Sequence, residues 1–110
     1  MKKINIMLVC GSGSSSGFVA QAIRKAMKKV EIGGEVFARG HTELTDYIET
    51  IDALLIGPHF GGLLDNTVMM NRLTDRNITV MVMDKNKYSI MDGKGILYDL
   101  IKKMMEEDKL

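Results

Sequence analysis

The chain has 110 residues, which fits one domain with a single hydrophobic core and leaves little room for a second. Its 15 Lys and Arg residues nearly balance its 14 Asp and Glu residues, so there is no electrostatic basis for binding nucleic acid. No apolar run approaches the roughly 20 residues that a membrane-spanning helix needs, and we expect a cytoplasmic protein without direct membrane insertion.

The chain begins with a predicted strand and an amphipathic helix. Residues 4–9 are apolar and β-favouring, which predicts a buried strand. From Gly17 onward, apolar residues recur at helical spacing, and Gly33 with Gly34 is expected to end this helix. The predicted apolar stripe consists of Phe18, Val19, Ala22, Ile23, Ala26, Met27 and Val30.

Two further strand and helix pairs follow. Residues 35–38 form a shorter strand candidate with polar flanks, which is typical of a position near a sheet edge. Thr42 is expected to cap a brief helix after it. Residues 53–56 form a third, buried strand that ends in the turn sequence GPHFGG. Residues 63 to about 75 form the next predicted helix.

The last predicted pair is a strand over residues 78–83 and a helix that starts at Asp92 or Gly95. Its helical stripe is formed by Ile96, Leu97, Leu100, Ile101, Met104 and Met105. Strands and helices therefore alternate four times, which predicts an α/β fold with one parallel sheet and helices on both faces. For four strands, the doubly wound order is 2-1-3-4.

In such a sheet, the winding direction changes between strands one and three, and ligands bind there, beyond the carboxyl ends of the strands. The loops over residues 10–17 and 57–62 are predicted to meet at this point. Cys10, the only cysteine in the chain, opens the first of these loops. We therefore expect the cysteine to lie where such folds carry out chemistry.

The loop after Cys10 contains only small residues, namely Gly11, Ser12, Gly13, Ser14, Ser15, Ser16 and Gly17. Because small residues let backbone N–H groups approach an anion, and because a helix follows, this is a predicted phosphate-binding loop. The same donors favour the thiolate form of the cysteine. Cys10 is thus the predicted catalytic nucleophile, which accepts a phosphoryl group. The alternative is a small hydrophobic residue before an ordinary turn.

The loop lacks the residues that other phosphate or thiol chemistries require. No Lys follows the glycines, which excludes a Walker loop, and Gly13 stands where a C-x-x-C pair has its second cysteine. A cysteine phosphatase needs an Arg six positions after the cysteine, and this position is Ser16. These absences favour a phosphoryl carrier. A small cysteine phosphatase and a non-catalytic anion-binding module remain as alternatives.

These residues resemble a known family, the IIB component of the lactose/cellobiose class of the bacterial sugar phosphotransferase system (PTS). The family pattern, a strand followed by Cys-x-x-Gly-x-Ser/Thr-Ser, matches Cys10, Gly13, Ser15 and Ser16. The continuation GFVAQAIRKA is similar to the lactose-type branch. Later segments of the family resemble LLIGPHF, LTDRNITV and YSIMDGKGILYDLI in the same order. The resemblance covers nearly the whole chain.

The resemblance implies a single IIB domain over residues 1–110, with a flavodoxin-like fold and a phosphatase-like P-loop. It implies a relay in which Cys10 accepts a phosphoryl group from the phosphohistidine of a IIA partner. Cys10 then passes this group to a sugar held by the membrane-embedded IIC transporter. The sugar would be lactose, cellobiose, chitobiose or a similar β-glycoside. The chain would therefore be a phosphotransferase of sugar transport, and no cofactor is expected.

Three residues outside the first loop are candidates for the same site. Pro58 and His59 lie on the second loop, where the family usually has Gln after Pro. His59 is available to donate a hydrogen bond to phosphate or to accept a phosphoryl group, and the alternative is a surface loop residue. Tyr88 matches a family tyrosine that either closes over the loop or packs. Asp84 is expected to be a cap or a loop carboxylate, with a general acid as the alternative, and His41 is expected to be a loop residue without a role. The sequence shows no constellation of metal ligands.

Overall fold

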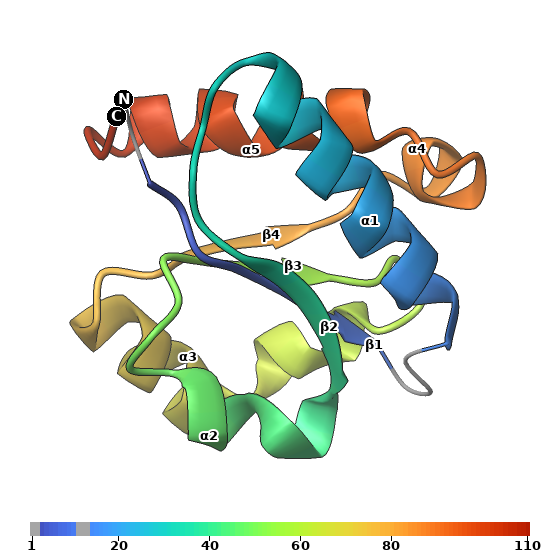
Figure 1. The fold of residues 1–110 in the computed structure, drawn as a ribbon. Helices are drawn as coiled ribbons and strands as arrows, with labels where there is room; N and C mark the ends of the chain where they lie inside the picture. The colour runs from blue at the N-terminus through green and yellow to red at the C-terminus, as the bar shows by residue number, and fades with distance from the viewer. Residues whose placement is uncertain (1–2, 11–13) are drawn as a thin grey trace.

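Four parallel strands form the sheet. The structure, a computed structural model, describes residues 3–10 and 14–110. The strands are β1 (Ile6–Cys10), β2 (Val36–Gly40), β3 (Ala53–Ile56) and β4 (Thr79–Val82). They lie in the order β2-β1-β3-β4 (Figure 1), which confirms the predicted α/β fold. The change in winding direction thus falls between β1 and β3, as expected.

Helices cover both faces of the sheet (Figure 1). One face carries α1 (Ser14–Lys29) and α5 (Gly93–Glu106), and the other carries α2 (Leu44–Tyr47) and α3 (Thr67–Asp75). The other helical segments are η1 (His41–Glu43), η2 (Gly61–Asp65) and α4 (Lys85–Ser89). Within the described part of the chain, none of these helices has both the length and the apolar character that a membrane crossing requires.

The central strand β1 is buried along its whole length. Ile6 and Leu8 belong to the core beneath α1 and α5, whereas Met7 and Val9 belong to the core beneath α2 and α3. Side chains alternate between the two faces along a strand. The alternation therefore directs the side chain of Cys10 to the face that α1 covers.

The strand β2 forms one edge of the sheet, as its polar flanks predicted. The amide of Ile6 donates a hydrogen bond to the carbonyl of Glu35 at 2.8 Å, and Ile6 is in register with Val36. In this parallel pairing, the backbone groups of Val36 and Ala38 point away from β1, toward the free edge.

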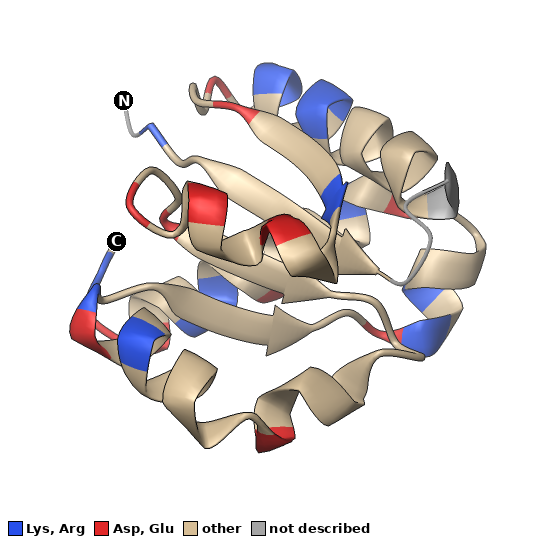
Figure 2. Cartoon of the chain, turned by 90° about the horizontal axis from the view of Figure 1, so that it is seen from below, with Lys and Arg blue, Asp and Glu red and all other residues tan. Residues whose placement is uncertain are grey.

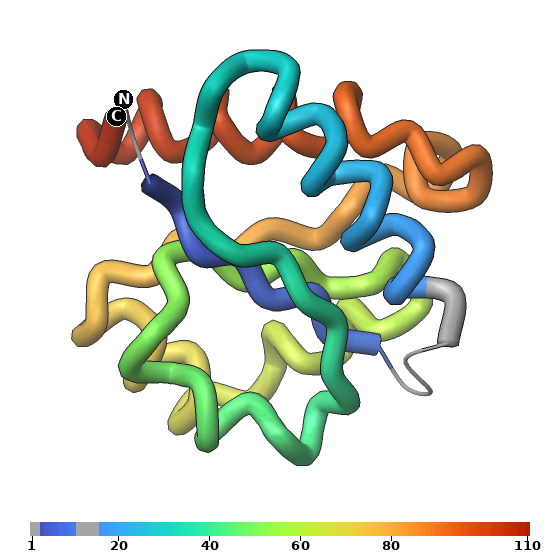
Figure 3. Tube along the Cα trace, viewed as in Figure 1, coloured from blue at the N-terminus to red at the C-terminus, as the bar shows by residue number. Residues whose placement is uncertain are grey.

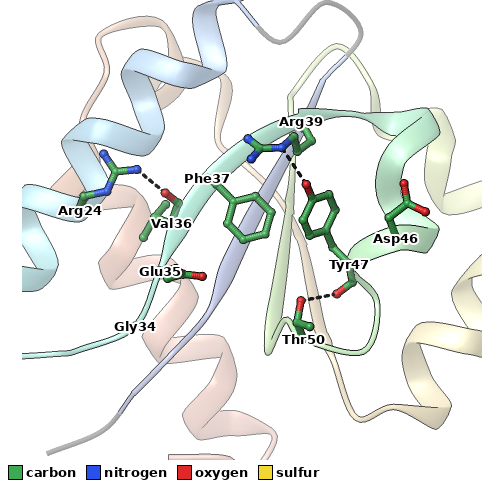
Figure 4. A pocket seen from close by; sticks show the side chains of 9 residues that line it. All are labelled: Arg24, Gly34, Glu35, Val36, Phe37, Arg39, Asp46, Tyr47 and Thr50. Carbon is green, nitrogen blue, oxygen red and sulfur yellow. Dashed lines mark hydrogen bonds between the residues drawn. The ribbon is translucent and has the colours of Figure 1, made fainter.

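Two arginine side chains cover the carbonyls of this edge. Arg24 of α1 donates to the carbonyl of Val36 (Figure 4), and Nη1 of Arg39 donates to the carbonyl of Ala38 at 2.8 Å. Nε of Arg39 also donates to the hydroxyl of Tyr47 at 3.1 Å, which fixes the guanidinium along a groove of about 620 Å³. An added strand would need the same carbonyls, so the arginines oppose edge-to-edge pairing.

Three details of the sequence prediction are wrong. The helix α1 begins at Ser14 and not at Gly17, because Ser is favoured at helix N-termini. Thr42 lies inside η1 and does not cap a helix. The predicted apolar stripe is not buried throughout, since Phe18 and Val30 are 60% and 57% exposed. Phe18 lies at the margin of the stripe, and Val30 follows the end of the helix.

Side-chain caps begin the later helices. Asp92 accepts a hydrogen bond from the amide of Gly95 at 2.9 Å, which confirms Asp92 as the start of the last helix. Asn66 accepts from the amide of Met69 at 3.1 Å and begins α3. This cap divides the predicted helix over residues 63–75 into η2 and α3.

Candidate functional site

Cys10 is the last residue of β1 and lies at the carboxyl end of the sheet. Its Cα is in register with Gly40, the last residue of β2, and its side chain is buried. Beside it, the amide of Gly57 donates to the carbonyl of Val9 at 2.9 Å. The trace in Figure 3 shows β1 and β3 ending on the same side of the molecule, next to the start of α1. The chain therefore brings its two candidate loops to one place.

The sulfur of Cys10 has a hydroxyl as a direct neighbour. Ser16, the third residue of α1, is fully buried, and its Oγ lies 2.8 Å from the Sγ of Cys10. The first amides of a helix have no partner within the helix, and the helix dipole makes this end positive. A negatively charged group carried by the sulfur would therefore lie in a favourable electrostatic environment.

The predicted phosphate-binding loop divides into two parts. Gly11, Ser12 and Gly13 lie outside the described residues, so their contact with phosphate stays a prediction. The remaining residues, from Ser14 to Gly17, form the first turn of α1. Their amides thus belong to a helix N-terminus, which is the arrangement that binds phosphate in many proteins.

The second loop follows β3 at the same end of the sheet. Pro58 is half-buried, and His59 is exposed to solvent. The ring of Phe60 lies against the ring of His41, with 4.8 Å between the ring centres. This contact joins the residues after β2 to those after β3. The described His, Cys, Asp and Glu residues form no group of three that could hold a metal ion.

Sequence reasoning missed the position of His41. The structure makes it the first residue of η1, directly after Gly40, which is in register with Cys10. The predicted strand order already put the end of the second strand beside Cys10. The position of His41 could therefore have been predicted from the topology. His41 thus belongs to the same end of the sheet as the candidate nucleophile.

The segment after β4 is held by caps and by one ion pair. Asp84 accepts from the amide of Lys87 at 3.0 Å, which confirms its role as a cap. Nζ of Lys87 lies 2.8 Å from a carboxylate oxygen of Asp99 in α5. The hydrogen bond to Asp99 raises the pKa of Lys87 above its ordinary value. Tyr88 is half-buried and packs against the core beneath α1 and α5. Its closure over the first loop stays a prediction.

Large apolar side chains are exposed on the segments at this end of the sheet. They are Phe18 (60%) in α1, Leu64 (45%) in η2, and Ile90 (74%) and Met91 (45%) after α4. Exposed apolar side chains that gather on one side often mark a surface for binding another protein. The carboxyl end of the sheet therefore combines a buried thiol with apolar surroundings.

Comparison with known proteins identifies the family. A model described as "PTS system, Lactose/Cellobiose specific IIB subunit" matches residues 5–99. The chain belongs to this family. It is a sugar-specific IIB component of the lactose/cellobiose type, which confirms the resemblance found in the sequence. IIB components are parts of phosphotransferases, so the chain is a transferase component of PTS sugar transport.

Individual relatives agree with this assignment. The IIB chain is 30% identical over 94 residues to the PTS system oligo-beta-mannoside-specific EIIB component of Bacillus subtilis (strain 168), covering 86% of this chain and 87% of that protein. The cellobiose-specific IIB protein of Borrelia burgdorferi is 27% identical, with a TM-score of 0.67 over 91% of this chain and 90% of the other. The lactose-specific IIB domain of Streptococcus pneumoniae, at 14% identity, shares the fold, with a TM-score of 0.78 over 92% and 97%.

Proposed function

We propose that Cys10 carries the phosphoryl group of this IIB component. The thiolate attacks the phosphorus of a phosphohistidine on a IIA partner, so that an S–P bond forms while the N–P bond breaks and the nitrogen keeps its electron pair. A hydroxyl of a sugar bound by the IIC transporter then attacks the same phosphorus. An O–P bond forms, the S–P bond breaks, and the hydroxyl proton is released to water.

One observation carries this proposal. The sulfur of Cys10 lies 2.8 Å from the hydroxyl of Ser16, within the first turn of α1, at the position where a cysteine phosphatase has its arginine. A hydroxyl and a helix N-terminus stabilise a bound phosphoryl group through hydrogen bonds. They do not supply the fixed cation that clamps the transition state of hydrolysis. The site thus favours retention of the group over its release to water.

The names of the relatives suggest the class of sugar. The related proteins are described as specific for oligo-beta-mannosides and for cellobiose, which are both β-linked saccharides. We therefore propose a β-glycoside as the final acceptor. The proposal puts the chain in the cytoplasm, together with its phosphohistidine donor.

We also propose that IIA and IIC bind in turn to one surface, here called the Cys10 face. It consists of residues 12–16, of which 12 and 13 lie outside the described residues, together with Phe18, residues 58–62 and residues 84–92. A phosphoryl group passes only between sites in direct contact, so both partners must reach Cys10. Phe18, Ile90 and Met91 are exposed there, and apolar side chains suit a transient interface because their desolvation is inexpensive.

Phosphoryl transfer from phosphoenolpyruvate tests the proposal. With the general PTS proteins and a IIA partner, the intact chain should gain the mass of one phosphoryl group, located on Cys10 by peptide mass spectrometry. Cys10→Ser should gain none, and its circular dichroism spectrum should match that of the parent. Normal labelling of Cys10→Ser would exclude the carrier role. Steady release of p-nitrophenol from p-nitrophenyl phosphate would instead favour a phosphatase.

A further inference from the structure

A groove of about 470 Å³ lies between α1 and α5, and the described part of the chain leaves it open. Its walls come from both helices and from the turn after α1. The lining residues are Ala22, Lys25, Ala26, Lys29, Val30, Ile32, Lys94, Leu97, Tyr98 and Ile101. None of them belongs to the Cys10 face, so the groove is a separate feature of the molecule.

Apart from its three lysines, the lining of the groove is mainly apolar. Val30 on the α1 side and Tyr98 on the α5 side are 57% and 65% exposed, although both are large side chains. The helices are held together beside them, since a Cβ on Gly93 would lie only 2.3 Å from the backbone carbon of Ala22. Close backbone packing fixes the spacing of the two walls, and a preorganised groove loses less entropy when it binds a partner.

Within the described part of the chain, the charged residues that line the groove are all basic. Lys25 and Lys29 lie on α1 and Lys94 lies on α5, and the described lining contains no acidic residue. The helix α1 contains basic residues in its second half and no acidic residues. The basic residues appear as blue bands on this helix in Figure 2. An occupant with acidic side chains would therefore match the rim, whereas a basic one would be repelled.

We infer that this groove binds a helical segment of a partner protein, with an apolar stripe and acidic residues on both sides of it. Two helices that flank a groove offer ridges into which a third helix packs. The α1 wall runs from Ala22 to Lys29, about 10 Å at a rise of roughly 1.5 Å per residue. This length accommodates about two turns, so the segment presents apolar side chains at positions i, i+3 or i+4, and i+7.

Charge also argues against a second copy of the chain as the occupant. If two copies joined through this groove, Lys25, Lys29 and Lys94 of each copy would face one another without acidic partners in the lining. The inference does not depend on the proposed phosphoryl relay. The partner would bind one face of the molecule while Cys10, at the end of the sheet, remains accessible.

NMR titration of the ¹⁵N-labelled chain tests the inference with two synthetic helical peptides. One peptide carries Leu at i, i+3, i+4 and i+7 with Glu on both flanks, and the matched peptide carries Lys in place of Glu. We expect the Glu peptide to shift the resonances of residues 22–32 and 94–101, and the Lys peptide to cause no shift there. Shifts confined to the Cys10 face, or no shifts at millimolar peptide, would overturn the inference.

Charge reversal of the rim provides the second arm. The variant K25E/K29E/K94E should bind the Glu peptide at least roughly tenfold more weakly and should now bind the Lys peptide. Its circular dichroism spectrum should be that of the parent chain, since all three side chains are exposed. Unchanged affinity for the Glu peptide in this variant would contradict the proposed site.

A charge-matched control separates the groove from the net charge. The variant K28E/K85E/K102E changes the same number of exposed lysines, and none of these lines the groove. It should keep the affinity of the parent for the Glu peptide. An equal loss of affinity in both triple variants would refute the groove as the binding site.

Two other results would identify a different occupant. If the chain forms a dimer in sedimentation experiments and K25E/K29E/K94E abolishes this dimer, the occupant is a second copy of the chain. Binding to phosphatidylglycerol vesicles without binding of the Glu peptide would show a membrane surface instead.

Discussion

The hydroxyl of Ser16 lies 2.8 Å from the sulfur of Cys10. The residue six positions after the cysteine is therefore a direct neighbour of the sulfur, because the chain turns from β1 into α1 within a few residues. A short neutral side chain in this position supplies one hydrogen bond to the sulfur. An arginine would supply a charge and two parallel hydrogen bonds to a phosphoryl oxygen pair.

We expect Ser16→Ala to slow phosphoryl transfer to Cys10. The variant removes a buried hydroxyl beside the sulfur, and a hydrogen bond of this kind contributes about 1 kcal/mol, or roughly a fivefold change in rate. The rate of labelling from phosphorylated IIA measures the effect. The control is Thr74→Val, which removes an exposed hydroxyl that donates to the carbonyl of Met70 within α3, away from the Cys10 face. An unchanged rate in Ser16→Ala would show that the hydroxyl does not assist transfer.

We expect Phe18→Asp to weaken the docking of IIA. Phe18 is 60% exposed, so the variant should unfold with a free energy within about 0.5 kcal/mol of the parent. Loss of a central apolar contact and gain of a charge should reduce phosphoryl receipt by roughly tenfold at limiting IIA. Met105→Asp is the matched control, because Met105 is 58% exposed and lies near the end of α5. Equal effects of both variants would contradict the proposed Cys10 face.

The strand order could be predicted because the sequence alternates between two clear periods. Short apolar runs such as 53–56 lie between helical stripes, and few topologies are compatible with four such pairs. Once the order 2-1-3-4 is accepted, Cys10 must lie at the carboxyl end of the sheet, beside the start of a helix. The cysteine and its surroundings were therefore within reach of sequence reasoning.

Other features depend on tertiary contacts that no local pattern reports. The five-residue α4 is too short for a helical period, and only its cap, Asp84, was visible in the sequence. The exposure of Phe18 depends on how α1 is rotated against the sheet. The contact between His41 and Phe60 joins residues from two loops and depends on the exact end of each strand.

Gly93→Ala should destabilise the fold. An added Cβ would lie 2.3 Å from the backbone carbon of Ala22, and neither helix backbone can move away without disturbing the core. Overpacking of this kind costs about 1–3 kcal/mol of unfolding free energy, which chemical denaturation measures. Gly17→Ala is the control, because no atom lies within 4 Å of its added Cβ. It should be stabilised by about 0.5–1 kcal/mol, since Ala is a better helix former. Equal stability of the two variants would refute the close contact.

The double variant R24A/R39A should self-associate. It uncovers the carbonyls of Val36 and Ala38 on the free edge of β2, which then become available to a strand of another molecule. Sedimentation velocity should show concentration-dependent dimers or larger species that the parent lacks. The control variant K28E/K102E changes two lysines away from this edge. It should sediment at the same mass as the parent. A monomeric R24A/R39A variant would mean that other features protect the edge.

Glu107 should make the stability depend on acid pH. The hydroxyl of Thr79 donates to its carboxylate at 2.7 Å, and Nζ of Lys109 lies 2.9 Å from the same oxygen. The hydrogen bond from Thr79, with help from Lys109, lowers the pKa of Glu107 below its usual 4.5. A lowered pKa means that the carboxylate stabilises the folded state above about pH 4.5, and that this stabilisation is lost as the pH falls through the folded-state value.

Unfolding of the parent chain and of Glu107→Gln between pH 3 and pH 7 checks this dependence. We expect the parent to be more stable near neutral pH and the two free energies to converge as the pH falls through the lowered folded-state pKa of Glu107, because both side chains are uncharged below that value. Glu106→Gln removes the same charge from the adjacent, exposed residue and controls for net charge. Two results would show that the contact with Thr79 contributes no stability. In the first, the unfolding free energies of the parent and Glu107→Gln differ by the same amount at every pH. In the second, Glu107→Gln and Glu106→Gln differ from the parent equally at every pH.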